Sequence, residues 1–311
     1  MRKTILLTGG AGFIAHHVVE YLLNNTDVNI VTLDRLDYSG NLNRLNEVVT
    51  SVPKSEQKRV RTVFHDLKAE LNPQIRASVG NVDQIVHLAA GSHVDRSIKF
   101  PRTFLESNVV GTFNLLEAVM PHWESLSNER RTSFRFIHIS TDEVFGSLGH
   151  KGYFSEDSPY NPSSPYSATK AASDHLVRSW NNTYGIPAII TNSCNNFGPF
   201  QFPEKLIPVI ISRCLFNKSI PLYGDGKYVR DWIYVEDHID ALLKVMLEGK
   251  IGDSYCIGGK QLKTNEEVVN IVCNLLDVYK KDNSPHIRFK KHIKDRLGHD
   301  RRYAIDNKKI S

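Results

Sequence analysis

The feature that most constrains the fold is the short apolar segment Thr4 to Thr8, which leads directly into Gly9-Gly10-Ala11-Gly12. An amphipathic pattern at helical spacing follows from Ile14 to Leu23. A strand, a glycine turn and a helix in this order form the unit that places a pyrophosphate at a helix N-terminus. Gly9 permits the turn, Gly12 lets the backbone approach the anion, and Ala15 is small enough for close helix packing. The N-terminal segment therefore predicts a dinucleotide site.

The same alternation of short apolar runs and amphipathic stretches continues through the first two-thirds of the chain. The expected strands are 4–8, 30–34, 60–64, 84–88, 134–140 and 188–191, and the clearest expected helices are 14–23, 104–119 and 167–180. This order predicts an α/β fold with a Rossmann-type, doubly wound parallel sheet. After residue 191 the chain becomes richer in Pro, Asn and Gly. We expect residues 1–191 to form the NAD-binding domain and residues 192–311 to form mainly a smaller C-terminal substrate-binding lobe, with some elements returning to the main sheet.

Composition narrows the functional class. The 311 residues are 41% hydrophobic and carry a formal charge of +5, with the basic residues scattered along the chain. This balance suits a small anionic ligand better than a nucleic acid. The four cysteines are far apart and no His cluster has metal-ligand spacing, so we expect reduced thiols, no metal and a cytoplasmic protein. No signal peptide and no membrane-spanning run is predicted, and no membrane partner is expected.

The identity of the dinucleotide depends on the end of the second expected strand. Asp34 follows the glycine motif by about 20 residues, where a carboxylate accepts hydrogen bonds from the ribose hydroxyls and repels a 2′-phosphate. The neighbouring Arg35 weakens that repulsion. The pattern favours NAD over NADP.

Five residues are the candidates for catalysis. Tyr166 and Lys170 are four residues apart at the start of an expected helix and project from one face. Lys170 and a cationic nicotinamide are expected to lower the pKa of Tyr166 and make it a usable base. Thr141, Asp142 and Glu143 end the fifth expected strand, at the carboxyl edge of the sheet where ligands bind. Both acids serve one substrate only if the strand turns there, and Val144-Phe145-Gly146 permits that turn.

Motifs in the same order along nearly the whole chain resemble the dTDP-glucose 4,6-dehydratases of the extended short-chain dehydrogenase/reductase superfamily. Besides the segments above, they are Tyr38-Ser39-Gly40-Asn41, His87 to Ala90, Ser92 to Ser97, Asn195 to Pro199, Phe202 to Leu206, Arg230-Asp231-Trp232 and Gly298 to Tyr303. The Thr-Asp-Glu triplet is specific, because the related 4-epimerases lack the adjacent acid pair.

The resemblance implies a reaction in three steps. Tyr166, aided by Lys170 and Thr141, removes the C4 hydroxyl proton while hydride passes to NAD. Glu143 then removes the C5 proton as Asp142 protonates the departing C6 hydroxyl, and the hydride returns to C6. The product is a 4-keto-6-deoxy sugar nucleotide, of which a deoxysugar such as rhamnose is the usual destination. These roles need Asp142 neutral in the resting complex, which burial beside Glu143 favours.

Further contacts are implied by the same resemblance. The NAD contacts are Gly9, Gly12, Phe13, Ile14, Asp34, Arg35, Leu36, Asp37, Asp66, Leu67, Leu88, Ala89, Ala90, Ser107, Tyr166, Lys170 and Asn196. The sugar-nucleotide contacts are Ser92, Thr141, Asn195, Lys205, Leu206, Pro221, Tyr223, Arg230, Asn265, Arg296 and His299. The two arginines suit a diphosphate, because a guanidinium binds phosphate oxygens in a fork. The family is typically homodimeric, through the helices of 104–119 and of Tyr166.

Some positions depart from the family pattern and leave alternatives open. Gly91 stands where relatives usually carry Glu or Gln, Leu297 replaces a usual proline, and relatives continue past the position of Ser311 with a helix that can add a base or sugar contact. A 4-epimerase and a catalytically silent binding module are the alternatives to a dehydratase. No position separates thymidine from uridine, and one methyl group is worth only ~1–3 kcal/mol, so dTDP-glucose and UDP-glucose are both expected substrates.

Overall fold

The computed structural model describes residues 2–311 and centres on a seven-stranded sheet in the order β10-β6-β5-β4-β1-β2-β3. All neighbours in this sheet run parallel. Its strands are β1 (Thr4–Thr8), β2 (Asn29–Asp34), β3 (Val60–Phe64), β4 (Gln84–His87), β5 (Arg135–Thr141), β6 (Ala188–Ser193) and β10 (Ser254–Ile257). The predicted Rossmann-type fold class is confirmed.

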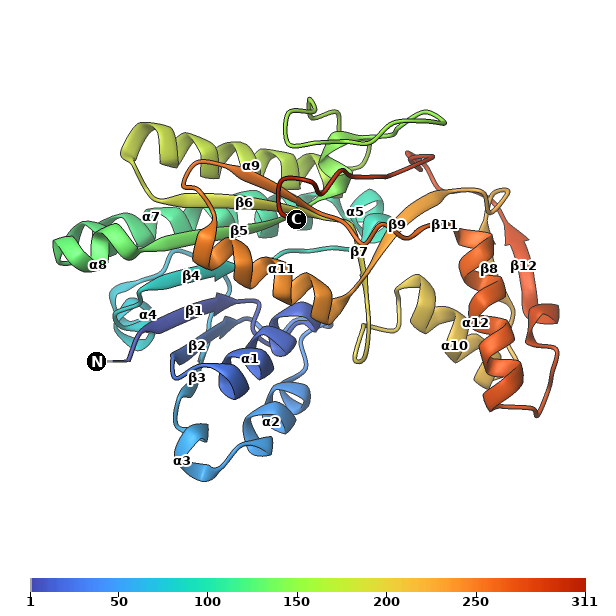
Figure 1. Ribbon diagram of the computed structural model, residues 1–311, viewed down its shortest axis with the longest axis horizontal. Helices are drawn as coiled ribbons and strands as arrows, with labels where there is room; N and C mark the ends of the chain where they lie inside the picture. The colour runs from blue at the N-terminus through green and yellow to red at the C-terminus, as the bar shows by residue number, and fades with distance from the viewer. Residues whose placement is uncertain (1) are drawn as a thin grey trace.

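Helices cover both faces of the sheet, as Figure 1 shows. One face packs against α1 (Phe13–Asn25), α2 (Leu42–Ser51) and α11 (Val235–Glu248), and the other against α4 (Pro73–Val79), α7 (Gly111–Ser125) and α9 (Pro165–Tyr184). Successive side chains of a strand point to opposite faces, so Ile5 and Leu7 pack with α1 whereas Leu6 packs with α7. Burial of both faces explains why the central strand β1 is mainly apolar, whereas the edge strand β3 keeps Arg61 and an exposed Phe64.

Short helices connect the larger elements. They are α3 (Lys54–Gln57), α5 (Val94–Lys99), α6 (Pro101–Phe104), α8 (Asn128–Ser133) and the 3₁₀ turns η2 (Asp142–Phe145) and η3 (His286–Phe289).

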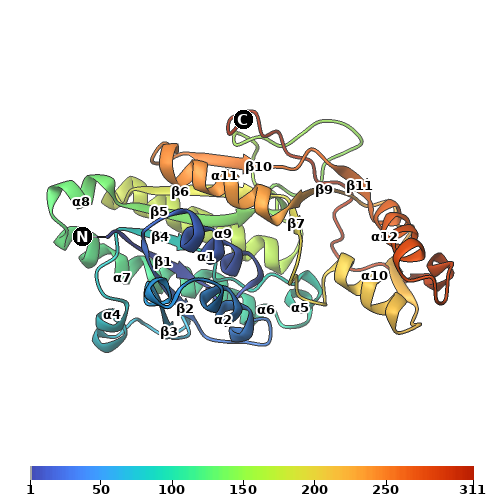
Figure 2. The same cartoon turned by 60° about the horizontal axis from the view of Figure 1, so that its bottom comes forward.

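A second lobe stands beside the carboxyl edge of the sheet, at the right of Figures 1 and 2. It contains β7 (Asn195–Phe197), β9 (Val229–Tyr234) and β11 (Leu262–Thr264) in one small sheet, the pair β8 (Ile220–Tyr223) and β12 (Lys290–Ile293), and the helices α10 (Leu206–Leu215) and α12 (Asn265–Tyr279). The chain does not stay in this lobe, because α11 returns to the main sheet and β10 pairs with β6.

The expected helix 104–119 differs from the prediction. It is divided into α6, a π-helical segment η1 (Leu105–Val110) and α7. In the π-helical segment, the Asn108 carbonyl accepts hydrogen bonds from Thr112 Oγ1 (2.6 Å) and Ser173 Oγ (2.7 Å). The Asn108 side chain holds the backbone of Gly91 through two further bonds. Tertiary hydrogen bonding thus accompanies a wider turn that hydrophobic spacing does not reveal, at a place next to the site.

Among residues 2–311, no helix combines the length and the apolar character that crossing a membrane requires.

Candidate active site

Two adjoining cavities lie where β1, β2, β4 and β5 end. One is about 100 Å³ and the other about 270 Å³, and both are lined by Gly9, Gly12, Leu88 and Ala90. The smaller cavity also gathers these predicted cofactor residues: Asp34, Arg35, Asp37, Asp66, Leu67, Ala89 and Ser107. The larger cavity also gathers Phe13, Ile14, Tyr166, Lys170 and Asn196. Residues predicted from seven separate segments therefore form one continuous surface.

The glycines at this edge leave room that any side chain would fill. Gly9 has a φ of 71°, and a Cβ there would lie 3.0 Å from the backbone of Ala89. A Cβ on Gly12 would lie 3.0 Å from the Gly9 carbonyl. Gly12 is also the N-cap of α1, whose first turn contains no acidic side chain. A bare helix N-terminus beside a backbone cradle fits a pyrophosphate.

The charged residues at the ribose end are fixed by hydrogen bonds and by an ion pair. The Asp34 carboxylate accepts hydrogen bonds from the Ala11 N–H (2.9 Å) and the Leu36 N–H (2.7 Å). Arg35 pairs with Asp37 (2.8 Å) and donates to Ser107 Oγ (3.0 Å). Because Asp37 engages the one cation in this group, Arg35 does little to offset the repulsion of a 2′-phosphate by Asp34, which favours NAD.

Leu36 is the one predicted cofactor residue that lines neither cavity. Its side chain is 37% exposed, and its backbone adopts a φ of 54°. The hydrogen bond from its N–H to Asp34 shapes the turn after β2. The contact of Leu36 with the cofactor therefore stays a prediction, whereas its part in the turn is observed.

The end of β5 turns as the two acids require. Thr141 caps the 3₁₀ turn η2 by accepting from the Glu143 N–H, and the turn ends at Gly146 with a φ of 82°. A Cβ on Gly146 would lie 2.2 Å from the Asn161 carbonyl oxygen, so glycine is required there. The turn brings Asp142 and Glu143 to the cavity that Tyr166 and Lys170 line.

The surroundings of the two acids separate their protonation states. Burial and the negative charge of Glu143 raise the pKa of Asp142 well above its ordinary value. Burial also raises the pKa of Glu143, but Arg230, Lys205 and Arg296 oppose this effect by their positive charges. Asp142 is thus the better proton donor and Glu143 the better base, which agrees with the roles expected from the sequence.

In the protein without a cofactor, the pKa of Tyr166 is not lowered as the sequence led us to expect. Burial and the charge of Glu143 raise its pKa far above the ordinary value, although hydrogen bonding to Thr141 lowers it. Lys170 directs its ammonium to the Ile139 carbonyl oxygen (2.8 Å), and burial lowers the pKa of this lysine to about 8. The positive charge of Lys170 is therefore not sufficient by itself to make Tyr166 a neutral-pH base.

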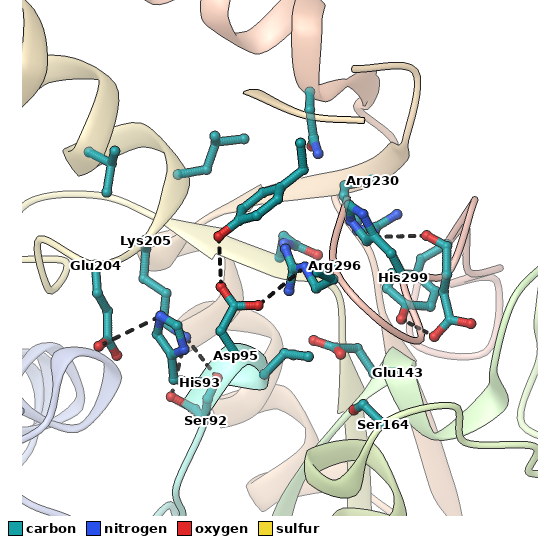
Figure 3. A pocket seen from close by; sticks show the side chains of 18 of the residues that line it. Ser92, His93, Asp95, Glu143, Ser164, Glu204, Lys205, Arg230, Arg296 and His299 are labelled. Carbon is teal, nitrogen blue, oxygen red and sulfur yellow. Dashed lines mark hydrogen bonds and ion pairs between the residues drawn. The ribbon is translucent and has the colours of Figure 1, made fainter. Parts of the chain in front are cut away.

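A third cavity, of about 300 Å³, lies between the sheet edge and the second lobe (Figure 3). It shares Glu143 with the cofactor cavity. It gathers ten of the predicted substrate residues, namely Ser92, Asn195, Lys205, Leu206, Pro221, Tyr223, Arg230, Asn265, Arg296 and His299, whereas Thr141 lines the cofactor cavity. Arg230 is buried, donates to the carbonyls of Val229 and Asp300, and lies over the Tyr303 ring at 4.3 Å.

Eleven lining residues were not among the predicted site residues. Six of them have acidic, hydroxyl or histidine side chains, namely His93, Asp95, Ser164, Glu204, Asp300 and Tyr303. Asp95 is the most informative, because it accepts from the Tyr223 hydroxyl (3.1 Å) and lies 3.5 Å from Arg296 Nε. Figure 3 shows Asp95 and Arg296 facing each other in the cavity. Asp95 therefore joins α5 to two substrate residues of the second lobe. The signal was its place inside the motif Ser92 to Ser97, but motif membership alone does not tell a contact from a helix cap.

Gly91 also has a structural explanation. A Cβ at this position would lie 3.1 Å from the ring of Phe104, a buried residue whose ring is edge-on to Tyr166 at 6.5 Å. The space for a side chain at position 91 is thus taken by Phe104.

Parallel sheet, glycine cradle and a Tyr-Lys pair beside an acid pair define the class: a dinucleotide-dependent enzyme of the extended short-chain dehydrogenase/reductase type. Residues 6–311 match the family model described as GDP-mannose 4,6 dehydratase. The chain is 48% identical to a dTDP-glucose 4,6-dehydratase of Shigella flexneri over 99% of this chain and 86% of that protein. It is also 48% identical to dTDP-glucose 4,6-dehydratase 1 of Escherichia coli K12, over 98% and 86%. The chain belongs to the nucleotide-sugar 4,6-dehydratase family.

Solved structures agree with this assignment. A dTDP-glucose 4,6-dehydratase of Streptomyces venezuelae, crystallised with NAD, superposes with a TM-score of 0.86 at 40% identity and covers 99% of this chain and 89% of that one. A UDP-glucose 4-epimerase of Thermotoga maritima gives a TM-score of 0.82 at 25% identity, over 98% and 90%. The fold is thus shared with epimerases, whereas the sequence is nearer the dehydratases.

Proposed function

We propose that this enzyme dehydrates dTDP-glucose, and also UDP-glucose, to the 4-keto-6-deoxy sugar nucleotide with NAD as a retained cofactor. The observation that carries the proposal is the acid pair of the buried Asp142 and the half-buried Glu143 at the same cavity as Tyr166 and Lys170. An epimerase needs only the tyrosine and the cofactor. Elimination of water needs an acid at one carbon and a base at the neighbouring carbon. Asp142 and Glu143 can supply them, because the pKa of both is raised but positive side chains oppose the rise mainly at Glu143.

The cofactor is held by the two cavities at the sheet edge. The pyrophosphate fits over Gly9 and Gly12, and the ribose hydroxyls fit beside Asp34. NAD supplies a positive charge beside Tyr166 and the carbon that accepts a hydride from C4 and returns it to C6. That charge complements Lys170 in lowering the pKa of Tyr166, which the protein alone leaves high.

The first step is proton removal at C4. Tyr166 takes the C4 hydroxyl proton while the C4 hydrogen leaves as hydride, so the carbon becomes a ketone. Thr141 and Tyr166 line the same cavity, where the threonine hydroxyl lowers the pKa of the tyrosine. Lys170 remains cationic at neutral pH because its pKa is about 8, and it stabilises the tyrosinate electrostatically.

The second step is elimination across C5 and C6. The C4 ketone acidifies the C5 proton, which Glu143 removes. Asp142 gives its proton to the C6 hydroxyl, and the C6–O bond breaks with loss of water. Glu143 would then give back the proton to C5 while the hydride returns from the bound cofactor to C6, which leaves the sugar as the 4-keto-6-deoxy product.

The substrate is held mainly by residues 192–311. Arg230 and Arg296 are proposed to bind the diphosphate, and Tyr223, Asn265 and His299 to contact the nucleoside side of the cavity. Residues 1–191 are proposed to carry the cofactor and the catalytic groups. In this division the acid Glu143 stands at the junction, because it lines both cavities.

We further propose a cytoplasmic homodimer whose product feeds deoxysugar synthesis, such as that of rhamnose. The support for the dimer is apolar exposure on η1, α7 and α9, where Leu105 is 52%, Phe113 41% and Tyr184 51% exposed. The support for a reducing compartment is that all four cysteines are free and buried.

The test is mass spectrometry of purified enzyme incubated separately with dTDP-glucose and UDP-glucose, without added NAD. Loss of one water from either substrate supports dehydration by an enzyme that retains its cofactor. A product with the mass of its substrate supports a 4-epimerase and contradicts the proposal. Binding without turnover, even after NAD is added, supports a silent module.

A further inference from the structure

A group of buried polar side chains connects Lys170 to strands β5 and β6. The side chains of His138 and Asp174 are 0% exposed, and that of Lys170 is 4% exposed. Lys170 Nζ lies 3.4 Å from His138 Nε2, and the same His138 atom lies 3.1 Å from Asp174 Oδ1. Lys170, His138 and Asp174 therefore form a row inside the protein, and the reaction steps above use only the lysine of this row.

Asp174 is built to be an anion. Its second oxygen, Oδ2, accepts hydrogen bonds from Ser140 Oγ (2.7 Å) and the Tyr160 hydroxyl (2.8 Å), while Asn192 Nδ2 lies at 3.5 Å. These donors come from β5, β6 and the loop before α9. Hydrogen bonds from His138 and Ser140, with the charge of Lys170, lower the pKa of Asp174 in spite of its burial.

His138 does not carry the balancing charge. Burial and the charge of Lys170 lower its pKa to about 4, so the ring is neutral at neutral pH. Its Nδ1 atom has no hydrogen-bond partner among residues 2–311. Its Nε2 atom lies between Lys170 Nζ (3.4 Å) and Asp174 Oδ1 (3.1 Å). The cation that balances Asp174 is therefore Lys170.

We propose that Asp174 is a positioning residue of the dehydration reaction, whose buried charge beside His138 keeps Lys170 protonated and in place next to Tyr166. The inference rests on the proposed function, because it assigns Asp174 to the same C4 step. Lys170 and Tyr166 are four residues apart on α9 and line one cavity. Because Lys170 stabilises the tyrosinate electrostatically, it can do so only while the lysine is protonated. Without Asp174, the lysine becomes a buried cation with no counter-ion.

The balance of charges around Lys170 supports the proposal. Burial lowers the pKa of Lys170 to about 8, and Asp174 raises it. The other groups that face it offer little replacement, since His87 on β4 and His138 on β5 are neutral and their pKa values are lowered. Further titratable groups at the cavity are Tyr166, Asp142, Glu143, Cys194, Glu204 and Lys205. Loss of the Asp174 charge thus moves the pKa of Lys170 down toward neutrality.

The experiment is the pH profile of kcat for Asp174→Asn, measured with the holoenzyme and dTDP-glucose. We expect the alkaline limb to move to lower pH by about one unit from the Lys170 pKa of about 8, so that kcat at pH 8 falls about fivefold. Activity should recover toward the wild-type value at lower pH, and the KM for dTDP-glucose should change little. Asp174→Glu, which keeps the charge, should keep the alkaline limb. A uniform fall of kcat with an unmoved limb would overturn the proposal.

Asp83→Asn is the matched control. Asp83 is buried, pairs with Arg130 at 2.7 Å and accepts from the Thr4 N–H, but it lies at the opposite end of β1 and β4. This variant should lower the Tm without moving the pH profile. A shift of the alkaline limb in Asp83→Asn equal to that in Asp174→Asn would count against a specific role for Asp174.

A second measurement remains decisive if Asp174→Asn fails to fold. Titration of Lys170 by NMR, in protein with ¹³C-labelled lysine and with Lys170→Arg used to assign the signal, should give a pKa of about 8. A value below 7 would overturn the proposal, because Asp174 would not be keeping the lysine charged. This titration needs no substrate, so it separates failure of the proposal from failure of the dehydratase function, which would appear as absent turnover by the unmodified enzyme.

Discussion

The cofactor region and the substrate region are built differently. The cofactor surface is made largely of backbone at the ends of consecutive parallel strands, with glycines where a Cβ would collide. The substrate surface is made of long charged and aromatic side chains from distant segments, and those side chains hold one another. Lys205 Nζ, for example, donates to the Ser92 carbonyl oxygen (2.7 Å), and Asp95 meets Tyr223 and Arg296.

This difference teaches where each region is vulnerable. A backbone site fails when a side chain is added, whereas a side-chain site fails when one is removed or shortened. The two regions meet at the end of β5, where Glu143 belongs to both. Substitutions in the three places should therefore change different kinetic quantities.

The largest effect is expected at the junction. Glu143→Gln keeps the shape of the side chain but removes the base, so kcat should fall by ~10²–10⁴-fold, as expected for loss of a positioned general base. Oxidation at C4 should still proceed, because Tyr166 and Lys170 are unchanged. Stopped-flow absorbance should show NADH forming and persisting, and mass spectrometry should show no loss of water. Unchanged turnover would contradict the assignment.

The second largest effect is expected from a substitution that disturbs only the cofactor region. Gly9→Ala places a Cβ at 3.0 Å from Ala89 at a φ of 71°. We expect the fraction of purified protein that retains NAD to fall by roughly tenfold, which corresponds to about 1.4 kcal/mol. Gly149→Ala is the matched control, because a Cβ at Gly149 has no neighbour within 4 Å. Equal NAD content in both variants would refute the backbone cradle.

A smaller effect is expected from substitutions that change only the substrate region. Arg230→Lys and Arg296→Lys keep the charge but lose the guanidinium fork, so the KM for dTDP-glucose should rise about tenfold with retained NAD unchanged. Arg301→Lys serves as control, because Arg301 pairs with Asp225 outside the substrate cavity. A fall in NAD content together with the rise in KM would show that the two regions are not separable in this way.

The smallest effect concerns stability. Because the folded pKa of Asp142 is raised above its ordinary 3.8, the folded protein holds a proton that the unfolded chain releases above that pH. This contribution to stability is complete below pH 3.8 and is lost as the pH rises toward the folded pKa. Asp142→Asn, a neutral isostere, should therefore raise the Tm at pH 7 while abolishing turnover. Scanning calorimetry should show the Tm difference shrinking as pH falls. A lower Tm at pH 7 would contradict a neutral Asp142.

The sequence predicted the backbone region better than it predicted the side-chain region. The glycine turn, Asp34 and the strand ends follow from local pattern, because parallel strands bring their carboxyl ends together. Membership of the substrate cavity came from the family resemblance and not from spacing. Asp95 was missed because its partners Tyr223 and Arg296 are far away in the chain. The contact between His138 and Asp174 was missed because the two residues lie within a strand and a helix. The hydrophobic periodicity of such elements does not reveal which polar side chains are buried together.

Two further features needed tertiary contacts. The π-helical segment around Asn108 coincides with hydrogen bonds to Gly91 and Ser173, which no periodicity contains. The high pKa of Tyr166 results from burial and from Glu143, whose proximity depends on the turn after β5. The boundary at residue 191 stays a prediction, since β10 and α11 leave the second lobe for the main sheet.

The most direct test of the central claim, that one site oxidises C4, eliminates water and reduces C6, is incubation with dTDP-glucose deuterated at C4 in ordinary water. We predict a product lighter by one water that retains the deuterium at C6, as observed by mass spectrometry and NMR. A product of unchanged mass, or a dehydrated product that has lost the deuterium, would contradict the account.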